Sequence, residues 1–182
     1  MLKGTKVILR AFEREDLPNA HRWINDWEVL RFLSPNFPQS MVEEERWFDS
    51  LQGRSDIKTF AIVTHEGRHI GTVDLRNIGF QTRSAELGIM IGEKDCWSQG
   101  YGTDAIKTLL SFAFQNLNLH RVYLRTFEFN SRGQRCFEKC GFKQEGALRE
   151  AVFRDGRYWD VIEMGILEDE WRSNEGGAHA RG

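Results

Sequence analysis

The sequence has little cysteine, little proline and almost no net charge. Its three cysteines, Cys96, Cys136 and Cys140, are too few for a disulfide framework, so a reducing compartment is expected. Lys and Arg number 25 against 27 Asp and Glu. Because this balance supplies no strongly basic surface, we expect no nucleic-acid partner.

Long apolar runs are also missing. No segment approaches the roughly 18 apolar residues of a membrane span. The first residues, MLKGTKVILRAFERED, hold no apolar run of signal-peptide length. Cys136 and Cys140 could share a helix face, but no His or Asp completes a recognisable metal set. We therefore expect a cytoplasmic protein with no membrane partner and no metal.

What is present fits one globular domain. A chain of 182 residues can bury a sizeable core, and we expect a domain over residues 1–172. Residues 173–182, SNEGGAHARG, have the composition of a flexible C-terminal tail. Of the 17 glycines, nine lie between residues 88 and 165, so that region needs backbone freedom or close backbone approach.

The periodicity predicts an α/β fold. Strand patterns occupy residues 7–10, 59–64, 69–76, 84–91, 122–129, 143–153 and 158–167. Helical patterns occupy residues 14–30, 40–51, 103–116 and 131–140. A helix separates strands 84–91 and 122–129, so these two should lie parallel in one mixed sheet. The pair Asp155-Gly156 predicts a tight turn between the last two strands.

A glycine-bearing loop lies between strand 84–91 and helix 103–116. It reads Trp97-Ser98-Gln99-Gly100-Tyr101-Gly102-Thr103. Free N–H groups at a helix N-terminus bind anions, and glycine lets a phosphate group approach the backbone. The loop completes neither the G-x-x-x-x-G-K-[ST] pattern nor the G-x-G-x-x-G pattern of other phosphate sites.

This loop resembles the Gln/Arg-x-x-Gly-x-Gly/Ala motif of the GNAT-superfamily N-acetyltransferases, with Trp97 in place of the first Gln or Arg. A second segment, from Asn130 to Phe137-Glu138-Lys139-Cys140-Gly141-Phe142, resembles the family's Asn-to-Tyr-x-Lys-x-Gly-Phe motif. The stretch 145–158 is similar to the RimJ/RimL-type branch and to bacterial spermidine N-acetyltransferases. The resemblance covers roughly residues 5–171.

The resemblance implies a single-domain GNAT fold. That fold has a mixed, mostly antiparallel sheet of seven strands, splayed central parallel strands and about four helices. Acetyl-CoA would lie in the splay as co-substrate, with its pantetheine arm along the first splayed strand and its pyrophosphate on the loop. The implied cofactor-binding residues are Ile89, Met90, Ile91, Ser98, Gln99, Gly100, Tyr101, Gly102, Thr103, Asn130, Phe137 and Lys139.

The resemblance also implies catalytic roles. Glu86 is the candidate base, and the backbone N–H of Met90 is the candidate donor that polarises the thioester oxygen. Phe137 stands where many family members have a Tyr, so it cannot protonate the departing thiolate. Either water protonates the thiolate, or one of Ser131, Cys136 and Tyr101 does.

The expected reaction is transfer of an acetyl group from acetyl-CoA to a primary amine. The RimJ/RimL resemblance favours a protein N-terminal α-amine, of the kind acetylated on ribosomal proteins. A polyamine or another small amine is the alternative, and a non-catalytic acyl-CoA-binding module is a second one. Phe32, Asp74 and Glu150 are the candidate acceptor-binding residues. The family resemblance also suggests a homodimer.

Overall fold

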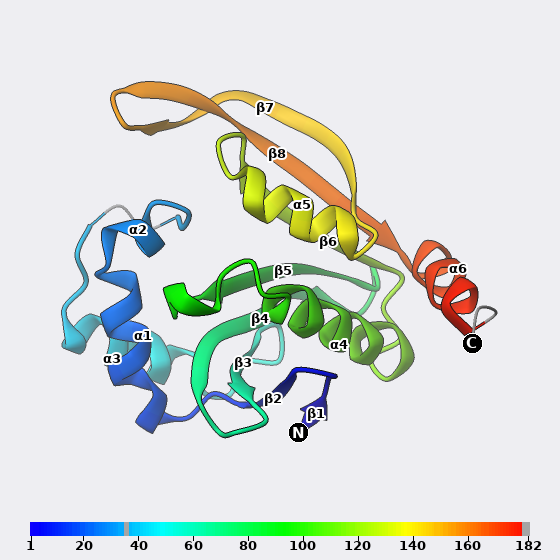
Figure 1. Ribbon diagram of the computed structural model, residues 1–182, viewed down its shortest axis with the longest axis horizontal. Coiled ribbons are helices and arrows are strands. Elements are labelled where there is room, and N and C mark those ends of the chain that lie inside the picture. Colours follow the sequence, from blue (N-terminus) through cyan, green and yellow to red (C-terminus); the bar gives the residue numbers. More distant parts are fainter. Residues whose placement is uncertain (35–36, 180–182) are drawn as a thin grey trace.

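The computed structural model describes residues 1–34 and 37–179. Its strands form one mixed sheet in the order β1-β2-β3-β4-β5-β6-β8-β7 (Figure 1). The strands are β1 (Leu2–Lys3), β2 (Val7–Ala11), β3 (Lys58–Thr64), β4 (His69–Gly79), β5 (Ser84–Ile91), β6 (Arg121–Phe127), β7 (Lys143–Arg154) and β8 (Arg157–Leu167). The α-helices are α1 (Leu17–Ile24), α2 (Trp27–Leu30), α3 (Met41–Ser50), α4 (Tyr101–Gln115), α5 (Ser131–Lys139) and α6 (Glu168–His179), with short 3₁₀ turns at Arg14–Asp16 and Lys94–Cys96.

The predicted α/β fold is confirmed, with three local differences. The short strand β1 makes the sheet eight-stranded instead of seven-stranded. The helix expected over 14–30 divides because Asp26 leaves helical geometry and its carboxylate caps α2, accepting the Glu28 N–H at 3.0 Å. Where a flexible tail was expected from residue 173, α6 continues to His179; residues 180–182 lie outside the described residues.

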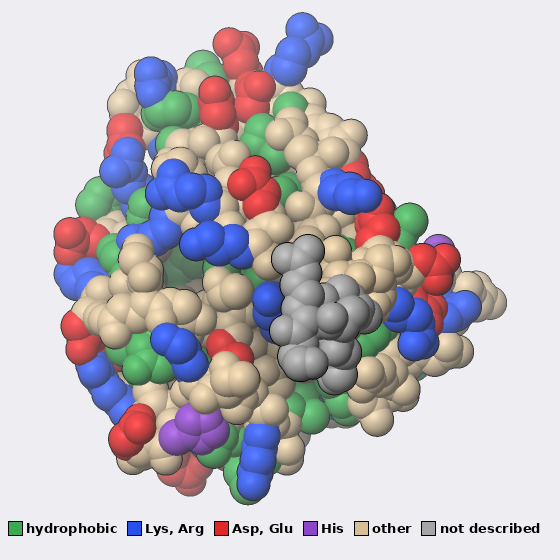
Figure 2. Space-filling view, turned by 45° about the vertical axis from the view of Figure 1, so that its right-hand side comes forward, with side chains coloured by type: hydrophobic (Ala, Val, Ile, Leu, Met, Phe, Trp, Pro, Cys, Tyr) green, Lys and Arg blue, Asp and Glu red, His purple; other side chains and the backbone are tan. Residues whose placement is uncertain are grey.

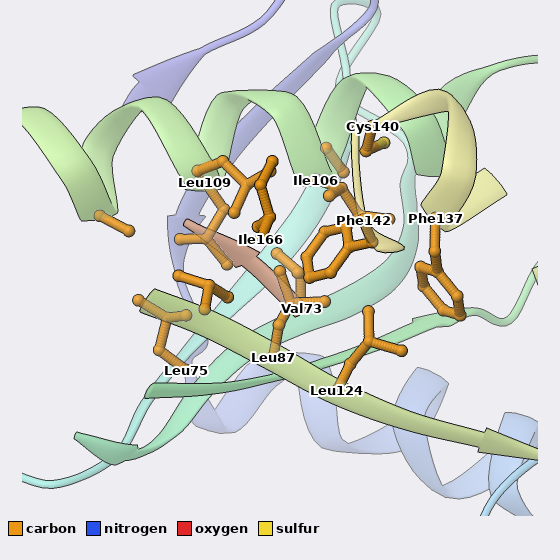
Figure 3. Close-up of a cluster of buried hydrophobic side chains, with 14 of the residues drawn as sticks. Val73, Leu75, Leu87, Ile106, Leu109, Leu124, Phe137, Cys140, Phe142 and Ile166 are labelled. Atoms are coloured by element: carbon orange, nitrogen blue, oxygen red, sulfur yellow. The ribbon is translucent and has the colours of Figure 1, made fainter. Parts of the chain in front are cut away.

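Helices cover both faces of the sheet. Side chains alternate along β3, so Ile62 joins the core under α4 while Ala61 and Val63 pack with α1 and α3 on the opposite face. The larger core brings strands, α4 and the end of α5 together (Figure 3). Its labelled members are Val73, Leu75, Leu87, Ile106, Leu109, Leu124, Phe137, Cys140, Phe142 and Ile166.

The central parallel pair separates after a short stretch of pairing. β5 and β6 pair in register from Ser84↔Arg121 to Glu86↔Tyr123. β5 then continues to Ile91 and β6 to Phe127 with no further pairing between them. Because β6 pairs with β8 along its other edge, the last residues of β5 have a free edge in the middle of the sheet. The predicted splay is therefore present.

The last two strands form the predicted hairpin. Asp155 (φ 51°) and Gly156 (φ 80°) join the paired Arg154 and Arg157 in a two-residue turn with positive φ at both positions. The buried Arg154 donates from Nη2 to the Leu33 carbonyl at 2.6 Å, which ties the hairpin to the segment after α2. None of the helices in the described residues is both long and apolar enough to cross a membrane.

Candidate active site

A cavity of about 360 Å³ lies between the free end of β5, the loop before α4, and α5. Of the residues implied by the resemblance, it is lined by Phe32, Ile89, Met90, Ile91, Ser98, Gly100, Gly102, Thr103, Asn130, Phe137 and Lys139. Trp97, Arg132, Arg135 and Cys136 line it as well, and these had not been predicted to bind the cofactor. Figure 2 shows Lys and Arg side chains bordering a hollow in the surface. The motifs that are separate in sequence thus meet at one cavity.

The two glycines of the loop have different reasons to be glycine. Gly100 precedes α4 with φ 88°, a left-handed conformation that other residues adopt at a cost. Gly102 has no such constraint. A Cβ there would lie 3.6 Å from Ile91 Cγ1 and 3.7 Å from Cys136 Sγ, which is ordinary contact distance. Gly102 is therefore not required by packing, and a side chain there would extend between β5 and α5 into the cavity.

Gln99 and Tyr101 do not line the cavity. The Gln99 side-chain amide donates to the Asp95 carbonyl, and the Gln99 carbonyl accepts from Lys6 Nζ at 2.8 Å. The Lys6 ammonium lies 5.7 Å from the centroid of the Tyr101 ring. The side chains of both residues thus stabilise the loop outside the cavity, and the expected contacts of their backbone N–H groups with the pyrophosphate stay predictions.

The backbone of β5 corrects the role expected for Met90. The Gly92 N–H donates to the Ile70 carbonyl of β4 at 2.9 Å. Backbone groups alternate in direction along a strand, so those of Met90 also face β4. The groups of Ile89 and Ile91 face the gap toward β6. The Met90 N–H therefore does not point into the cavity, although its residue lines it.

Trp97 contacts the end of β5, beside the gap between β5 and β6. Its indole Nε1 donates to the Ile91 carbonyl at 2.7 Å. The Arg132 guanidinium lies over the Trp97 ring at 3.7 Å and within 5.2 Å of the Phe32 ring centroid. Burial lowers the pKa of Arg132, and no carboxylate pairs with it among the described side chains. Arg132 is thus a cation that lines the cavity and can meet an anionic ligand.

α5 presents its first turn and Phe137 to the same cavity. Asn130 caps the helix: its Oδ1 accepts the Gly133 N–H at 3.0 Å and its Nδ2 donates to Thr126 Oγ1 at 3.2 Å. A contact from Asn130 to the cofactor stays a prediction. Phe137 is buried and packs against Phe142, with ring centroids 6.2 Å apart, so it supplies a wall and no proton.

The face of β4 and β5 that points away from α4 carries charged side chains. Cross-strand partners share a face, which places Asp74 beside Gly88 and Arg76 beside Glu86. Arg76 Nε lies 2.8 Å from Asp74 Oδ1, outside hydrogen-bond geometry, and a Cβ on Gly88 would collide with both side chains. Met90 is on this face too, so the charged group adjoins a residue that lines the cavity.

Burial raises the pKa of the Asp74 carboxyl, and the nearby Glu86 charge adds to that effect against the attraction of Arg76. Glu86 accepts a hydrogen bond from Asn77 Nδ2 at 3.0 Å and does not line the cavity. Two carboxylates and one cation thus lie on this face, with Arg76 paired to Asp74. This arrangement suits a second cation, such as an ammonium group.

Glu150 lies apart from this group. It occupies a bulge of the exposed strand β7, with φ 51°, and its N–H donates to Asp160 Oδ1 at 2.9 Å. Glu150 does not line the cavity, so the structure gives no support to its expected acceptor contact. The three cysteines are free thiols, and no group of three or more His, Cys, Asp or Glu within the described residues is placed to hold a metal ion.

A mixed sheet whose parallel pair separates beside a helix N-terminus is the arrangement that the resemblance to the CoA-dependent N-acetyltransferases implied. The family model described as "Acetyltransferase (GNAT) domain" matches residues 6–143. The chain therefore belongs to the GNAT acetyltransferase family and is an N-acetyltransferase with acetyl-CoA as co-substrate.

Known proteins resemble it over nearly their full length. The spermidine N(1)-acetyltransferase of Vibrio cholerae serotype O1 is 31% identical over 168 residues, 92% of this chain and 96% of that protein. The crystal structure of spermidine N-acetyltransferase from Vibrio cholerae with CoA and spermine has a TM-score of 0.86 and 31% identity, covering 91% of this chain and 98% of that one. A dodecameric structure of the Vibrio cholerae enzyme has a TM-score of 0.78 and 33% identity, covering 91% and 95%.

The comparisons confirm the family, the fold and the co-substrate. They do not confirm the RimJ/RimL branch, because the relatives that are 30% or more identical to this chain are spermidine N-acetyltransferases. For the same reason they favour the small-amine alternative over a protein N-terminus.

Proposed function

We propose that this protein acetylates a primary amine of a polyamine of the spermidine type. The observation that carries the proposal is that Asp74 and Glu86 lie on the same face of the sheet as Met90, with one cation, Arg76, paired to Asp74 and opposite Glu86 across the strands. A polyamine brings one ammonium group for each amine, and half-buried carboxylates attract such groups. The names of the similar proteins support the same acceptor.

The cavity fits acetyl-CoA on the other side of this pair. The free backbone groups of Ile89, together with the Ile91 N–H, can pair with the amides of the pantetheine arm as an added strand would. The cavity at Gly102 and the start of α4 suits the pyrophosphate, and Arg132 supplies a cation. The backbone N–H groups of the loop, those of Gln99 and Tyr101 included, stay candidates for the same anion.

The polarising N–H belongs to Ile89 or Ile91 in this proposal, because these groups face the gap and that of Met90 does not. Such a donor stabilises the charge that develops on the thioester oxygen. Water protonates the departing thiolate, since Phe137 has no proton to give and CoA is a thiol of ordinary acidity, with a pKa of about 8.5 by analogy with Cys.

Asp74 is the candidate base in this proposal on its pKa, while neither its carboxylate nor that of Glu86 lines the cavity. Burial raises its pKa, which brings it nearer to that of the amine whose proton it must take. Glu86 then acts in this proposal as a partner of the ammonium group. We expect Asp74→Asn to lower kcat by about tenfold or more, because a general base usually contributes more than that factor to the rate. Glu86→Gln should mainly raise KM for the amine, and an unchanged kcat in Asp74→Asn would return the base role to Glu86.

The acceptor is tested by thiol release from acetyl-CoA in the presence of spermidine, of peptides that begin with Ser, Ala or Thr, and of an aminoglycoside. Spermidine should raise the release well above hydrolysis, and the peptides should not. Release with the peptides alone would restore a protein N-terminus as the acceptor. Binding of acetyl-CoA with no release for any amine would identify an acyl-CoA-binding module.

We further propose a cytoplasmic homo-oligomer. The free thiols of Cys96, Cys136 and Cys140 suit a reducing compartment. A dodecamer is described for the similar Vibrio cholerae enzyme, and the exposed apolar side chains of the β7–β8 hairpin support an interface between copies.

A further inference from the structure

The segment formed by α2 and the residues directly after it connects the two sides of the split sheet. On the β5 side, Lys94 Nζ, in the 3₁₀ turn after β5, lies 2.8 Å from Asp26 Oδ2 at the start of α2. At the other end of α2, Arg31 Nη2 lies 2.7 Å from Asp155 Oδ2 in the turn of the β7–β8 hairpin. α2 and this turn lie at the same end of the molecule (Figure 1). Because β8 pairs with β6, the segment spans the gap between β5 and β6.

Further contacts join this segment to the β6 side. The buried Arg154 donates from Nη2 to the Leu33 carbonyl at 2.6 Å. The ring of Phe32 packs against the ring of Phe129, which follows β6, with centroids 6.1 Å apart. Phe129 packs in turn on Trp159 of β8, with centroids 5.0 Å apart. An ion pair, a hydrogen bond and a ring contact thus hold the end of this segment against the hairpin.

The same segment forms one wall of the cavity. It contributes three apolar lining residues, Val29, Phe32 and Leu33. The other lining residues come from β5, from the chain between β5 and the first turn of α4, and from α5 with its cap, where acetyl-CoA is placed above. The wall at α2 is therefore left for the acceptor. Arg31, Arg154 and Asp155 do not line the cavity, so they reach the acceptor only through the residues that they hold.

We propose that Arg154 and the Arg31–Asp155 ion pair position the acceptor for acetyl transfer by holding Phe32 and Leu33 as a wall of the cavity. The inference rests on the proposed function, because it takes the acceptor to be a polyamine beside acetyl-CoA. A wall at a fixed distance keeps the amine close to the thioester, and reaction in such a pair depends on that distance. Breaking the contacts should therefore weaken the use of the amine and leave the binding of acetyl-CoA unchanged.

The ion pair is tested by Arg31→Gln, Asp155→Asn and the double variant. Asn-Gly favours the same two-residue turn as Asp155-Gly156, so Asp155→Asn removes the charge and keeps the hairpin. Each single variant should raise KM for spermidine by about two- to fivefold, the factor that an exposed ion pair supplies. Calorimetry should find an unchanged affinity for acetyl-CoA. The double variant should match the single ones, because residues that act through one contact are not additive.

The hydrogen bond is tested by Arg154→Met, which removes the donor to the Leu33 carbonyl. It should lower kcat/KM for spermidine by about tenfold or more, since a buried hydrogen bond from a charged group is lost. Arg154→Lys should recover part of the loss, because an ammonium group also donates. Circular dichroism and urea unfolding show whether these variants fold, and the ion-pair variants test the proposal at surface positions.

Arg54→Gln is the matched control for the ion pair. It breaks an exposed pair in which Arg54 Nη2 lies 2.6 Å from Asp56 Oδ2, and neither residue lines the cavity. Its KM for spermidine should equal that of the unaltered protein. An equal rise of KM in this control would assign the effect to any lost surface ion pair and overturn the positioning role.

The direction of the KM changes separates holding from charge. If the pair acted only through charge, Arg31→Gln and Asp155→Asn would change KM in opposite directions, because one removes a cation and the other an anion near a cationic acceptor. That result overturns the proposal. An unchanged KM in both variants, or an equal loss of acetyl-CoA affinity, also overturns it while the proposed function stands. An unaltered protein that acetylates no polyamine would refute the proposed function, and the inference would fail with it.

Discussion

Individual glycines differ in whether the fold or the cavity requires them. Gly100 has a left-handed backbone, and Gly102 faces open space at the cavity. Gly88 has a third reason, because the Asp74–Arg76 ion pair lies where its side chain would be. The same residue type therefore serves conformation at one position, cavity space at the second and packing of charges at the third.

Alanine at the two loop glycines should give opposite results. Gly102→Ala should keep its free energy of unfolding, since nothing lies closer than 3.6 Å to the added methyl group and alanine favours a helix, but it should weaken acetyl-CoA binding. Gly100→Ala should lose about 1–2 kcal/mol of unfolding free energy because its φ is left-handed. Denaturant unfolding and calorimetry measure the two quantities. A folded Gly102→Ala with unaltered affinity would remove the loop from the cofactor site.

Elements far apart in the sequence are joined at the loops of the site. Trp23 of α1 lies flat on Gly92, where a Cβ would come within 2.0 Å of the indole, and its Nε1 donates to Glu93 at 2.9 Å. Arg68, before β4, donates to the same carboxylate at 2.7 Å. Helix α1 is thus fixed to the segment that leads from β5 into the glycine loop before α4.

Asp104 fastens the other side of that loop. Its carboxylate accepts the N–H groups of Thr5 (3.1 Å), Lys6 (2.8 Å) and Val7 (3.0 Å), and the Thr5 hydroxyl at 2.7 Å. Gly4 leaves room for it, since a Cβ there would lie 2.4 Å from Asp104 Oδ2. The turn between β1 and β2 is therefore held at the first turn of α4, where a negative charge is favourable.

This contact predicts a pH dependence of stability. Burial opposes the charge of Asp104, but the donors of Lys6 and Thr5 outweigh it and lower the pKa. A lowered pKa stabilises the folded state above the unfolded value of about 4, and this contribution is lost as the pH falls through the folded value. Asp104→Asn should lose about 1–2 kcal/mol of unfolding free energy at pH 7.

The difference between the unaltered protein and Asp104→Asn should shrink below pH 4. Urea unfolding at a series of pH values measures it, with Asp169→Asn of α6 as a control, since within the described residues only the backbone carbonyl of Asp169 accepts a hydrogen bond, from Ser173. A difference that stays constant over the acidic range would assign the loss to packing and not to the charge.

At the scale of the whole molecule, the β7–β8 hairpin is the least covered part of the fold (Figure 1). Leu148, Phe153 and Tyr158 are 43%, 55% and 63% exposed, and the last two rings pack on each other with centroids 5.1 Å apart. An edge strand with exposed apolar side chains is a surface that favours association.

We expect the protein to be a homo-oligomer through this hairpin. The double variant Phe153→Asp and Tyr158→Asp should have a smaller mass by light scattering, because the charges would have to be buried at the interface. Phe80→Asp is the matched control: Phe80 is 66% exposed in the turn after β4, and its variant should keep the mass of the unaltered protein. An equal loss of mass in both would place the interface elsewhere, and a monomeric unaltered protein would remove it.

Local order was determined by the sequence alone. Strand 84–91, the glycine loop and the helix after it follow from periodicity, from Gly100 and from the helix connection that makes the pair parallel. The Asp155-Gly156 turn followed from residue type, because few residues adopt positive φ. Most of the residues that the GNAT resemblance implied for the cofactor do line the cavity, because its motifs lie in these elements.

Only the tertiary structure decided which groups face the cavity. The direction of the Met90 N–H depends on strand register, where a shift of one residue reverses every group. The stacking of Arg132 on Trp97 joins segments more than thirty residues apart, and Asp74 meets Glu86 only across two paired strands. Such contacts carry no local pattern. The scarcity of cysteine excluded a disulfide framework, but the placement of Cys136 at the end of α4 came from packing.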